Sequence, residues 1–146
     1  MSVLALFVLG LVSAFLPGIG SEVIVLAAAA AAHGPWVAAL ILLAAAAQAM
    51  GKLGVYGLAA AGARAAPASG FGLPVLRAAL ERSACRAAAM IFMSALASVP
   101  PLYMTAIVCG AAHYGGVRFL CTVFAARAIR YAVVIGMLHP LRMVVP

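Results

Sequence analysis

Long apolar runs dominate the chain, separated by shorter stretches that are polar or rich in Gly and Pro. Four runs stand out, at residues 3–32, 36–61, 87–112 and 117–138. A helix needs about 20 consecutive apolar residues to cross the hydrocarbon core of a bilayer. The runs 36–61 and 117–138 are uninterrupted, and we predict that each forms a transmembrane helix.

The other two apolar runs are each interrupted near the middle. The breaks are Pro17-Gly18-Ile19-Gly20-Ser21-Glu22 and Ser98-Val99-Pro100-Pro101. Such breaks expose backbone groups that lipid cannot satisfy, so they must be buried in protein or face a watery cavity. The flanking pieces have about 10 to 14 residues, or about 15–21 Å of helix. This length favours half-membrane re-entrant hairpins over full crossings.

The stretch 62–86 between the two halves differs in character. Its first part is rich in Gly and Pro, and from Leu73 to Arg86 arginines alternate with Leu and Ala. We predict a loop followed by a basic amphipathic helix at the membrane surface. Four Arg against one Glu place this connection in the cytoplasm by the positive-inside rule. The nearly uncharged connections at 33–35 and 111–116 are expected on the outer side.

The two halves repeat the same order of features. Each has a broken apolar run, an Ala-Ala-His joint, and a helix in which a cation precedes a Tyr by one turn, as in Lys52-x-x-x-Tyr56 and Arg127-x-x-x-Tyr131. Paired broken segments of this kind point to a transporter site between repeats. We therefore predict one all-α integral membrane domain, residues 1–146. It consists of two inverted repeats, 1–61 and 87–146, each a broken or re-entrant hairpin followed by a transmembrane helix, with the cytoplasmic connection 62–86 between them.

Composition agrees with a membrane protein. Hydrophobic residues make up 68% of the 146 residues and charged residues only 8%, against about 25% charged in soluble domains. The formal net charge of +7 comes from one Lys and eight Arg against two Glu. Because the arginines lie between apolar runs and not on one polar face, we expect anionic lipid as the partner and no nucleic acid.

Apart from Arg118 at the start of the last run, four charged residues fall within the apolar runs. Glu22 directly follows the first break, and a carboxylate there is either paired with a cation or takes up protons reversibly. It could also cap the half-helix beginning near Val23. Lys52 and Arg127 each lie about 15 Å from either end of their helix, and Arg130 projects from the same side as Arg127.

These buried cations outnumber the anion, so a negatively charged ligand is expected. A lipid phosphate fits, because guanidinium donors match phosphate oxygens in a forked geometry. Gln48, one turn before Lys52, is predicted to share this polar interior. The predicted binding set is Glu22, Lys52, Arg127, Arg130 and Gln48, beside the hairpin breaks at Pro17, Gly18, Pro100 and Pro101.

Enzymatic chemistry finds little support in the sequence. Asp is absent, the three His are scattered, and the three Cys are widely spaced, so neither an aspartyl dyad nor a metal cluster is indicated. We predict no catalytic residues, no metal and no cofactor.

Several short motifs resemble the DedA/VTT (SNARE-associated) membrane proteins. They are Phe15-Leu16-Pro17-Gly18-x-x-Ser21-Glu22, Gln48-x-x-Gly51-x-x-x-x-Tyr56, Pro100-Pro101-x-Tyr103, Arg118-Phe119 and Arg127-x-x-Arg130-Tyr131. The resemblance implies two facing re-entrant hairpins, a bacterial inner-membrane location and lipid translocation, often coupled to protons. It assigns Glu22 to the family's acidic position. Two departures are Lys52, where many members have Asp, and the lack of Arg around the second break.

We therefore predict a multi-pass lipid translocator for an anionic lipid, such as a polyprenyl phosphate or a phospholipid. Two alternatives remain open: an exporter of small amphiphilic solutes through the same cavity, and a membrane scaffold that transports nothing. The sequence also leaves open a homo-oligomer, the coupling ion and the orientation of the termini.

Overall fold

A computed structural model describes residues 35–65 and 82–142, with positions 7, 8, 11, 12, 25 and 78. The long helical ranges are α3 (Pro35–Ala65), α5 (Ala84–Ala97), α6 (Leu102–Ala111) and α7 (Gly116–Arg142). Within the described ranges all regular structure is helical, which confirms the predicted all-α class. The first break, with Pro17, Gly18 and Glu22, lies outside the described residues, as do residues 66–77 and 79–81 of the connection 62–86.

The two longest helices, α3 and α7, match the uninterrupted apolar runs. They contain 31 and 27 residues, so they measure about 46 and 40 Å at 1.5 Å per residue. Both are long and apolar enough to cross a membrane. Large apolar side chains also cover their outer faces, including Leu42 and Leu58 on α3 and Val133 and Met137 on α7. These features support a membrane protein.

The third apolar run is divided where the sequence predicts. Helix α5 ends at Ala97 and α6 begins at Leu102, so the break occupies residues 98–101. Their 14 and 10 residues correspond to about 21 and 15 Å, each shorter than a bilayer core of about 30 Å. Ser83 caps the start of α5, because its hydroxyl accepts a hydrogen bond of 3.2 Å from the backbone nitrogen of Arg86.

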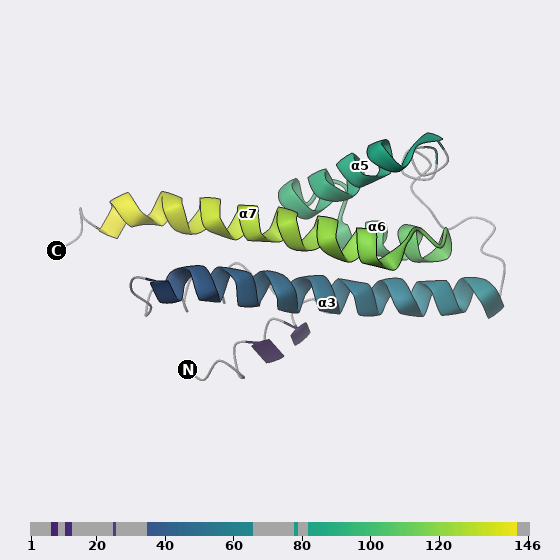
Figure 1. Cartoon of the computed structure of the whole chain (residues 1–146), viewed down its shortest axis with the longest axis horizontal. Helices are drawn as coiled ribbons and strands as arrows, with labels where there is room; N and C mark the ends of the chain where they lie inside the picture. The colour runs from purple at the N-terminus through teal and green to yellow at the C-terminus, as the bar shows by residue number, and fades with distance from the viewer. Residues whose placement is uncertain are drawn as a thin grey trace.

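Contacts between the helices fix their directions. Phe119 and Tyr131 on α7 pack near Tyr56 and Ala45 on α3, so these two helices are antiparallel. On α5, Cys85 lies near Cys121 of α7 and Leu96 lies near Arg130, so α5 runs parallel to α7. Helix α6 runs parallel to α3, since Tyr103 meets Lys52 and Gly110 meets Tyr56 and Ala59. Figure 1 shows this arrangement.

The chain therefore turns back on itself between α5 and α6. The start of α5, the end of α6, the start of α7 and the end of α3 all lie at one end of the bundle (Figure 1). The connection 111–116 was expected opposite the basic connection, and that expectation is wrong. Because α5 and α6 run in opposite directions, 111–116 returns to the end where α5 begins.

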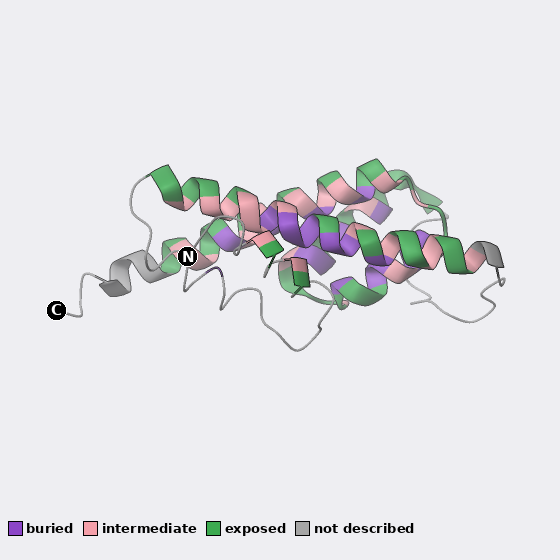
Figure 2. Cartoon of the chain, turned by 90° about the horizontal axis from the view of Figure 1, so that it is seen from below, coloured by how far each residue is buried: buried purple, intermediate pink, exposed green. Residues whose placement is uncertain are grey.

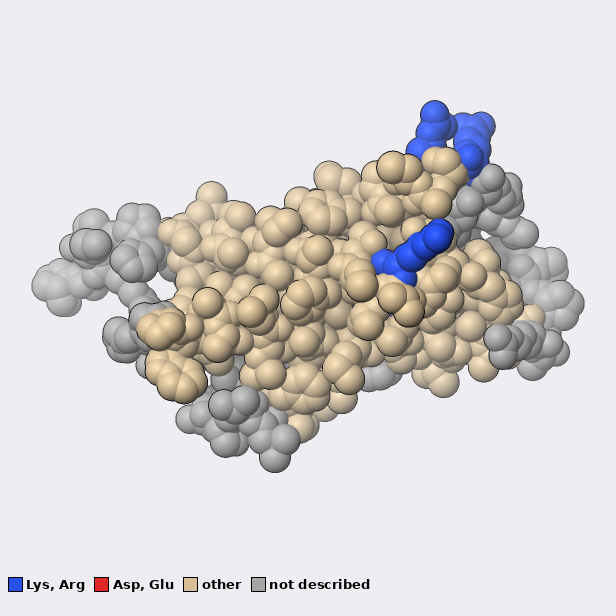
Figure 3. All heavy atoms as spheres, in the orientation of Figure 1, with Lys and Arg blue, Asp and Glu red and all other residues tan. Residues whose placement is uncertain are grey.

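The described cations on the surface gather at that same end. Arg82 and Arg86 are exposed near the start of α5, and Arg118 is exposed near the start of α7. In the view of Figure 3 the visible Lys and Arg side chains all lie there, while the rest of the described surface is uncharged. We call this the basic end of the bundle.

Two apolar clusters hold the helices together. The larger is centred on Ile91, Leu102, Phe119 and Val123 and joins α3, α5, α6 and α7. The smaller contains Val25, Ala45 and Tyr131, which brings one residue of the first apolar run against α3 and α7. Figure 2 shows that the buried residues concentrate in the middle of the bundle, where the helices overlap.

Candidate functional site

Two buried hydroxyl groups form hydrogen bonds to backbone oxygens at the break between α5 and α6. The Ser94 hydroxyl donates a hydrogen bond of 2.7 Å to the main-chain oxygen of Pro100 and lies 2.8 Å from the hydroxyl of Thr105. The Thr105 hydroxyl also lies 3.3 Å from the main-chain oxygen of Pro101, and its single proton is shared between that oxygen and the Ser94 hydroxyl. Both side chains are fully buried. Backbone groups freed by the two prolines are thus satisfied inside the protein, as an apolar environment requires.

Arg130 of α7 stabilises the other side of the break. Its Nη1 donates to the main-chain oxygen of Leu96 and to the hydroxyl of Ser98, the second at 3.0 Å. Ser98 adopts a left-handed conformation, with φ of 60°, and ends α5. A guanidinium at this position satisfies a terminal carbonyl and interacts favourably with the negative end of the helix dipole.

Lys52 and Arg127 form the second part of the site, between α3 and α7. Each is only 7% exposed, and they are close enough for their positive charges to repel each other. The Lys52 ammonium lies 5.3 Å from the ring centroid of Tyr103 on α6, a cation–π contact. Two like charges are therefore held together within an apolar bundle.

Both parts of the site lie inside the bundle, beyond the level at which Tyr56 of α3 stacks on Phe119 of α7. Measured from that level at 1.5 Å per residue and away from the basic end, Lys52 is about 6 Å along α3, and Arg127 and Arg130 are about 12 and 17 Å along α7. Gln48, 3% exposed, lies one helical turn beyond Lys52. We call this set the polar layer: Gln48, Lys52, Ser94, Ser98, Tyr103, Thr105, Arg127 and Arg130.

The structure brings together several of the residues singled out in the sequence. Lys52 and Arg127 are both buried and near enough for their charges to interact, and Arg130 contacts the break that includes Pro100 and Pro101. Gln48 lies on the same helix as Lys52 and is buried. Glu22, Pro17 and Gly18 lie outside the described residues, so the facing of the two breaks stays a prediction.

Sequence reasoning did not identify Ser94, Thr105 and Tyr103 as site residues. A signal for the first two is present: Ser94 is one turn before Ser98, and Thr105 is one turn after Pro101. Hydroxyl side chains at this spacing commonly bond to the backbone one turn away. Tyr103 entered the sequence argument only through the motif Pro100-Pro101-x-Tyr103, and its contact with Lys52 depends on how α6 packs on α3.

A separate apolar groove lies between α5 and α7, away from the buried cations. Its volume is about 600 Å³, and none of the predicted binding residues lines it. In the described part of the chain, no group of three or more His, Cys, Asp or Glu could hold a metal ion.

Comparisons with protein-family models, curated proteins and solved structures find no match for this chain. The arguments about function therefore rest on the geometry of the polar layer and on the motifs in the sequence.

Proposed function

We propose that this chain is a multi-pass protein of a bacterial inner membrane and translocates lipids with an anionic headgroup. The observation that carries the proposal is the pair Lys52 and Arg127, two buried cations between α3 and α7. Buried charges in a membrane are costly and are kept where they serve a substrate or ion path.

The charge count supports an anionic substrate. Lys52, Arg127 and Arg130 contribute three positive charges to the polar layer, and the described ranges contain no Asp or Glu. In the whole sequence the acids are Glu22 and Glu81, and Glu81 belongs to the basic connection. If Glu22 pairs with one of the cations, the layer still keeps a positive surplus. A visiting phosphate offsets that surplus.

Each cation has a distinct part in this proposal. Arg127 binds phosphate oxygens through its forked donors, and Lys52 supplies a compact second charge. Gln48 offers an amide to the glycerol or sugar-like part of a headgroup. Arg130 is engaged with the break, so it positions the site, and its direct contact with a headgroup stays a prediction. The apolar outer surfaces of α3 and α7 suit the lipid tail.

The hairpin α5–α6 is proposed to be re-entrant. Its helices, about 21 and 15 Å long, are each shorter than a bilayer core of about 30 Å, and both of its outer ends lie at the basic end of the bundle. The positive-inside rule assigns that end to the cytoplasm. Resemblance to the DedA/VTT proteins adds the expectation that a matching first hairpin carries Glu22, the residue that would respond to protons.

Reconstituted lipid translocation tests the proposal. The purified chain is placed in liposomes with a trace of fluorescent phosphatidylglycerol, and loss of outer-leaflet fluorescence to dithionite is followed. We expect wild type to move the lipid and Lys52→Gln/Arg127→Gln to reduce the rate to that of empty liposomes. Arg118→Gln, the same kind of change at an exposed site, is the matched control and should retain activity. A fully active double variant contradicts the proposal.

A non-transporting scaffold is the second candidate, and one observation favours it. Ser94, Thr105 and Arg130 satisfy the break without a ligand or a watery cavity. The scaffold reading predicts that wild type in liposomes moves no lipid, even though it inserts and keeps its helical circular dichroism. An amphiphilic-solute exporter would instead move a solute without requiring a phosphate.

A further inference from the structure

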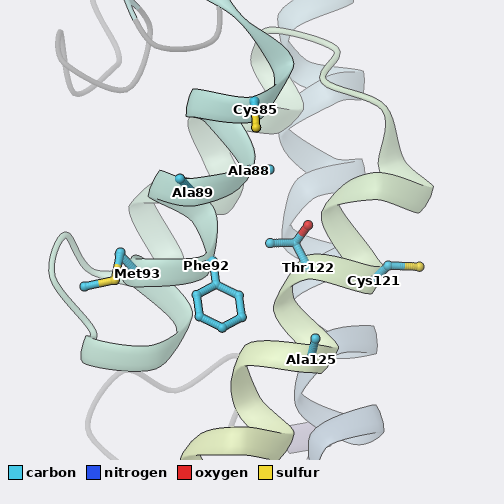
Figure 4. Close-up of a pocket in the computed structure, with 8 residues that line it drawn as sticks. All are labelled: Cys85, Ala88, Ala89, Phe92, Met93, Cys121, Thr122 and Ala125. Carbon is cyan, nitrogen blue, oxygen red and sulfur yellow. The ribbon is translucent and has the colours of Figure 1, made fainter.

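The groove between α5 and α7 is a second place where this chain can hold a ligand. It is lined by Cys85, Ala88, Ala89, Phe92, Met93, Cys121, Thr122 and Ala125. Its volume of about 600 Å³ lies within the range of about 300–1,000 Å³ typical of small-molecule sites. Figure 4 shows Phe92 and Thr122 projecting into the space between the two helices, with small Ala side chains around them.

The lining selects a hydrocarbon ligand. Its only polar side-chain group besides the two thiols is the Thr122 hydroxyl, and that hydroxyl already donates to the main-chain oxygen of Arg118 at 2.7 Å. The walls therefore offer an acyl chain apolar contact without leaving an unsatisfied polar group. Five of the lining residues, among them Met93 and Ala125, are exposed on the outside of the described bundle. A lipid can thus enter from the bilayer without passing through the polar layer.

Charge at the mouth of the groove selects the headgroup. Arg118 precedes Thr122 by four residues, so it lies on the same face of α7 as a lining residue, one turn nearer the basic end. Arg82 directly precedes Ser83, the residue that caps the start of α5. Arg86 adjoins Cys85, and all three arginines are exposed. Figure 3 shows cationic side chains over the starts of both helices. The described ranges place no acidic residue there to neutralise them.

We propose that this groove binds one acyl chain of an anionic phospholipid, with the phosphate held by Arg86 and Arg118 at the basic end and Arg82 nearby. The site is distinct from Lys52 and Arg127 and does not depend on lipid translocation. It is a fixed lipid position on the flank of the hairpin, where a bound chain fills the space between α5 and α7 and holds the two helices together.

Native mass spectrometry of the full chain, released from detergent, tests the site. Phosphatidylglycerol and phosphatidylcholine with identical oleoyl chains are titrated separately. We expect tighter binding of phosphatidylglycerol, and about fivefold weaker binding for each arginine removed, or roughly 25-fold for Arg86→Gln/Arg118→Gln, from about 1 kcal/mol per Arg at a membrane surface. Arg142→Gln, the same change at the other end of α7, should leave the affinity unchanged.

Two further variants separate this site from alternatives. Ala125→Trp should fill the groove and weaken binding of both lipids, whereas Lys52→Gln/Arg127→Gln, which removes the cations of the polar layer, should leave the protection of the groove thiol Cys85 by phosphatidylglycerol unchanged.

Native thiols give an independent reading of the same groove in nanodiscs. Two variants each keep a single cysteine, and both carry Cys109→Ala. The first also carries Cys121→Ser and keeps Cys85; the second carries Cys85→Ser and keeps Cys121. The Cys121 thiol points away from Phe92 and Thr122 in Figure 4, so it serves as the control. Phosphatidylglycerol should slow N-ethylmaleimide labelling of Cys85 more than that of Cys121. The proposal is overturned if the affinity for phosphatidylglycerol is unchanged in the arginine double variant, if both lipids bind equally, or if the two thiols are protected equally.

Discussion

The guanidinium of Arg130 lies 3.0 Å from the hydroxyl of Ser98 and also donates to the main-chain oxygen of Leu96. The middle of the long helix α7 is thereby joined to the end of the short helix α5. Arg130, which is only partly buried, thus contacts both the protein backbone and the break. This relationship predicts different behaviour for Arg130 and Arg127.

Removing the Arg130 side chain should mainly lower the stability of the α5–α6 hairpin. Arg130→Gln loses charge-assisted hydrogen bonds at the end of α5, and such bonds contribute about 1.5–3 kcal/mol each. We expect Arg130→Gln to have a clearly lower Tm than wild type in detergent, with unfolding measured by circular dichroism. Arg118→Gln, an exposed change on the same helix, should shift stability by no more than about 0.5 kcal/mol. Equal stability of the two variants would contradict the role assigned to Arg130.

Ser94 and Thr105 should act as a unit. Ser94→Ala leaves the oxygen of Pro100 without its hydroxyl donor and also removes the partner of Thr105, so we expect a loss of about 1–3 kcal/mol. Thr105→Val should have a similar effect. The double variant should lose less than the sum of the two, because the shared hydrogen bond is already gone in each single variant. Chemical denaturation of all four proteins measures this coupling, and simple additivity would rule it out.

Gly110 and Gly57 offer a matched pair of substitutions. A Cβ at Gly110 would overlap the main-chain oxygen of Tyr56 and lie 3.0 Å from the Cβ of Ala59, whereas at Gly57 no atom lies within 4 Å. Gly110→Ala should force α6 away from α3 and cost about 1–3 kcal/mol. Gly57→Ala should be neutral or stabilising by about 0.5–1 kcal/mol, since Ala favours helix over Gly. The Tm of Gly110→Ala should therefore fall below that of wild type, whereas the Tm of Gly57→Ala should stay the same or rise.

Water access to the break can be measured with cysteine labelling. In a variant lacking the three native cysteines, Val99→Cys lies at a position 73% exposed beside the break, and Ile129→Cys lies at a position 46% exposed on α7. If the break opens to a watery cavity, an impermeant thiol reagent should label position 99 several-fold faster than position 129. Slow labelling at both positions in intact membranes would favour the scaffold reading.

The break was predictable because its cause is local. Two consecutive prolines remove backbone donors wherever the chain places them, so the end of α5 at Ala97 and the start of α6 at Leu102 follow from the sequence. The same holds for α3 and α7, whose apolar length is visible without any tertiary information. The predicted burial of Lys52 and Arg127 also follows from their distance to the helix ends.

The partners of these residues were harder to predict. Lys52 meets Tyr103 only because α6 runs parallel to α3, and that direction depends on the reversal at 98–101. The same reversal brings the connection 111–116 to the basic end. A count of charges in the loops had predicted that this connection lies at the opposite end. Likewise, Arg130 was grouped with Arg127 by spacing alone, and only packing against α5 shows that it bonds to the break.

The return of the hairpin to the basic end has a consequence for topology. Helix α3 ends there, α7 begins there, and both outer ends of the α5–α6 hairpin lie there. Pro35 and Arg142 consequently lie on the same side of any membrane that α3 and α7 span, and Ser83 lies on the other. Reporter proteins attached after position 142 and inserted at position 83 are therefore expected to mature in different compartments.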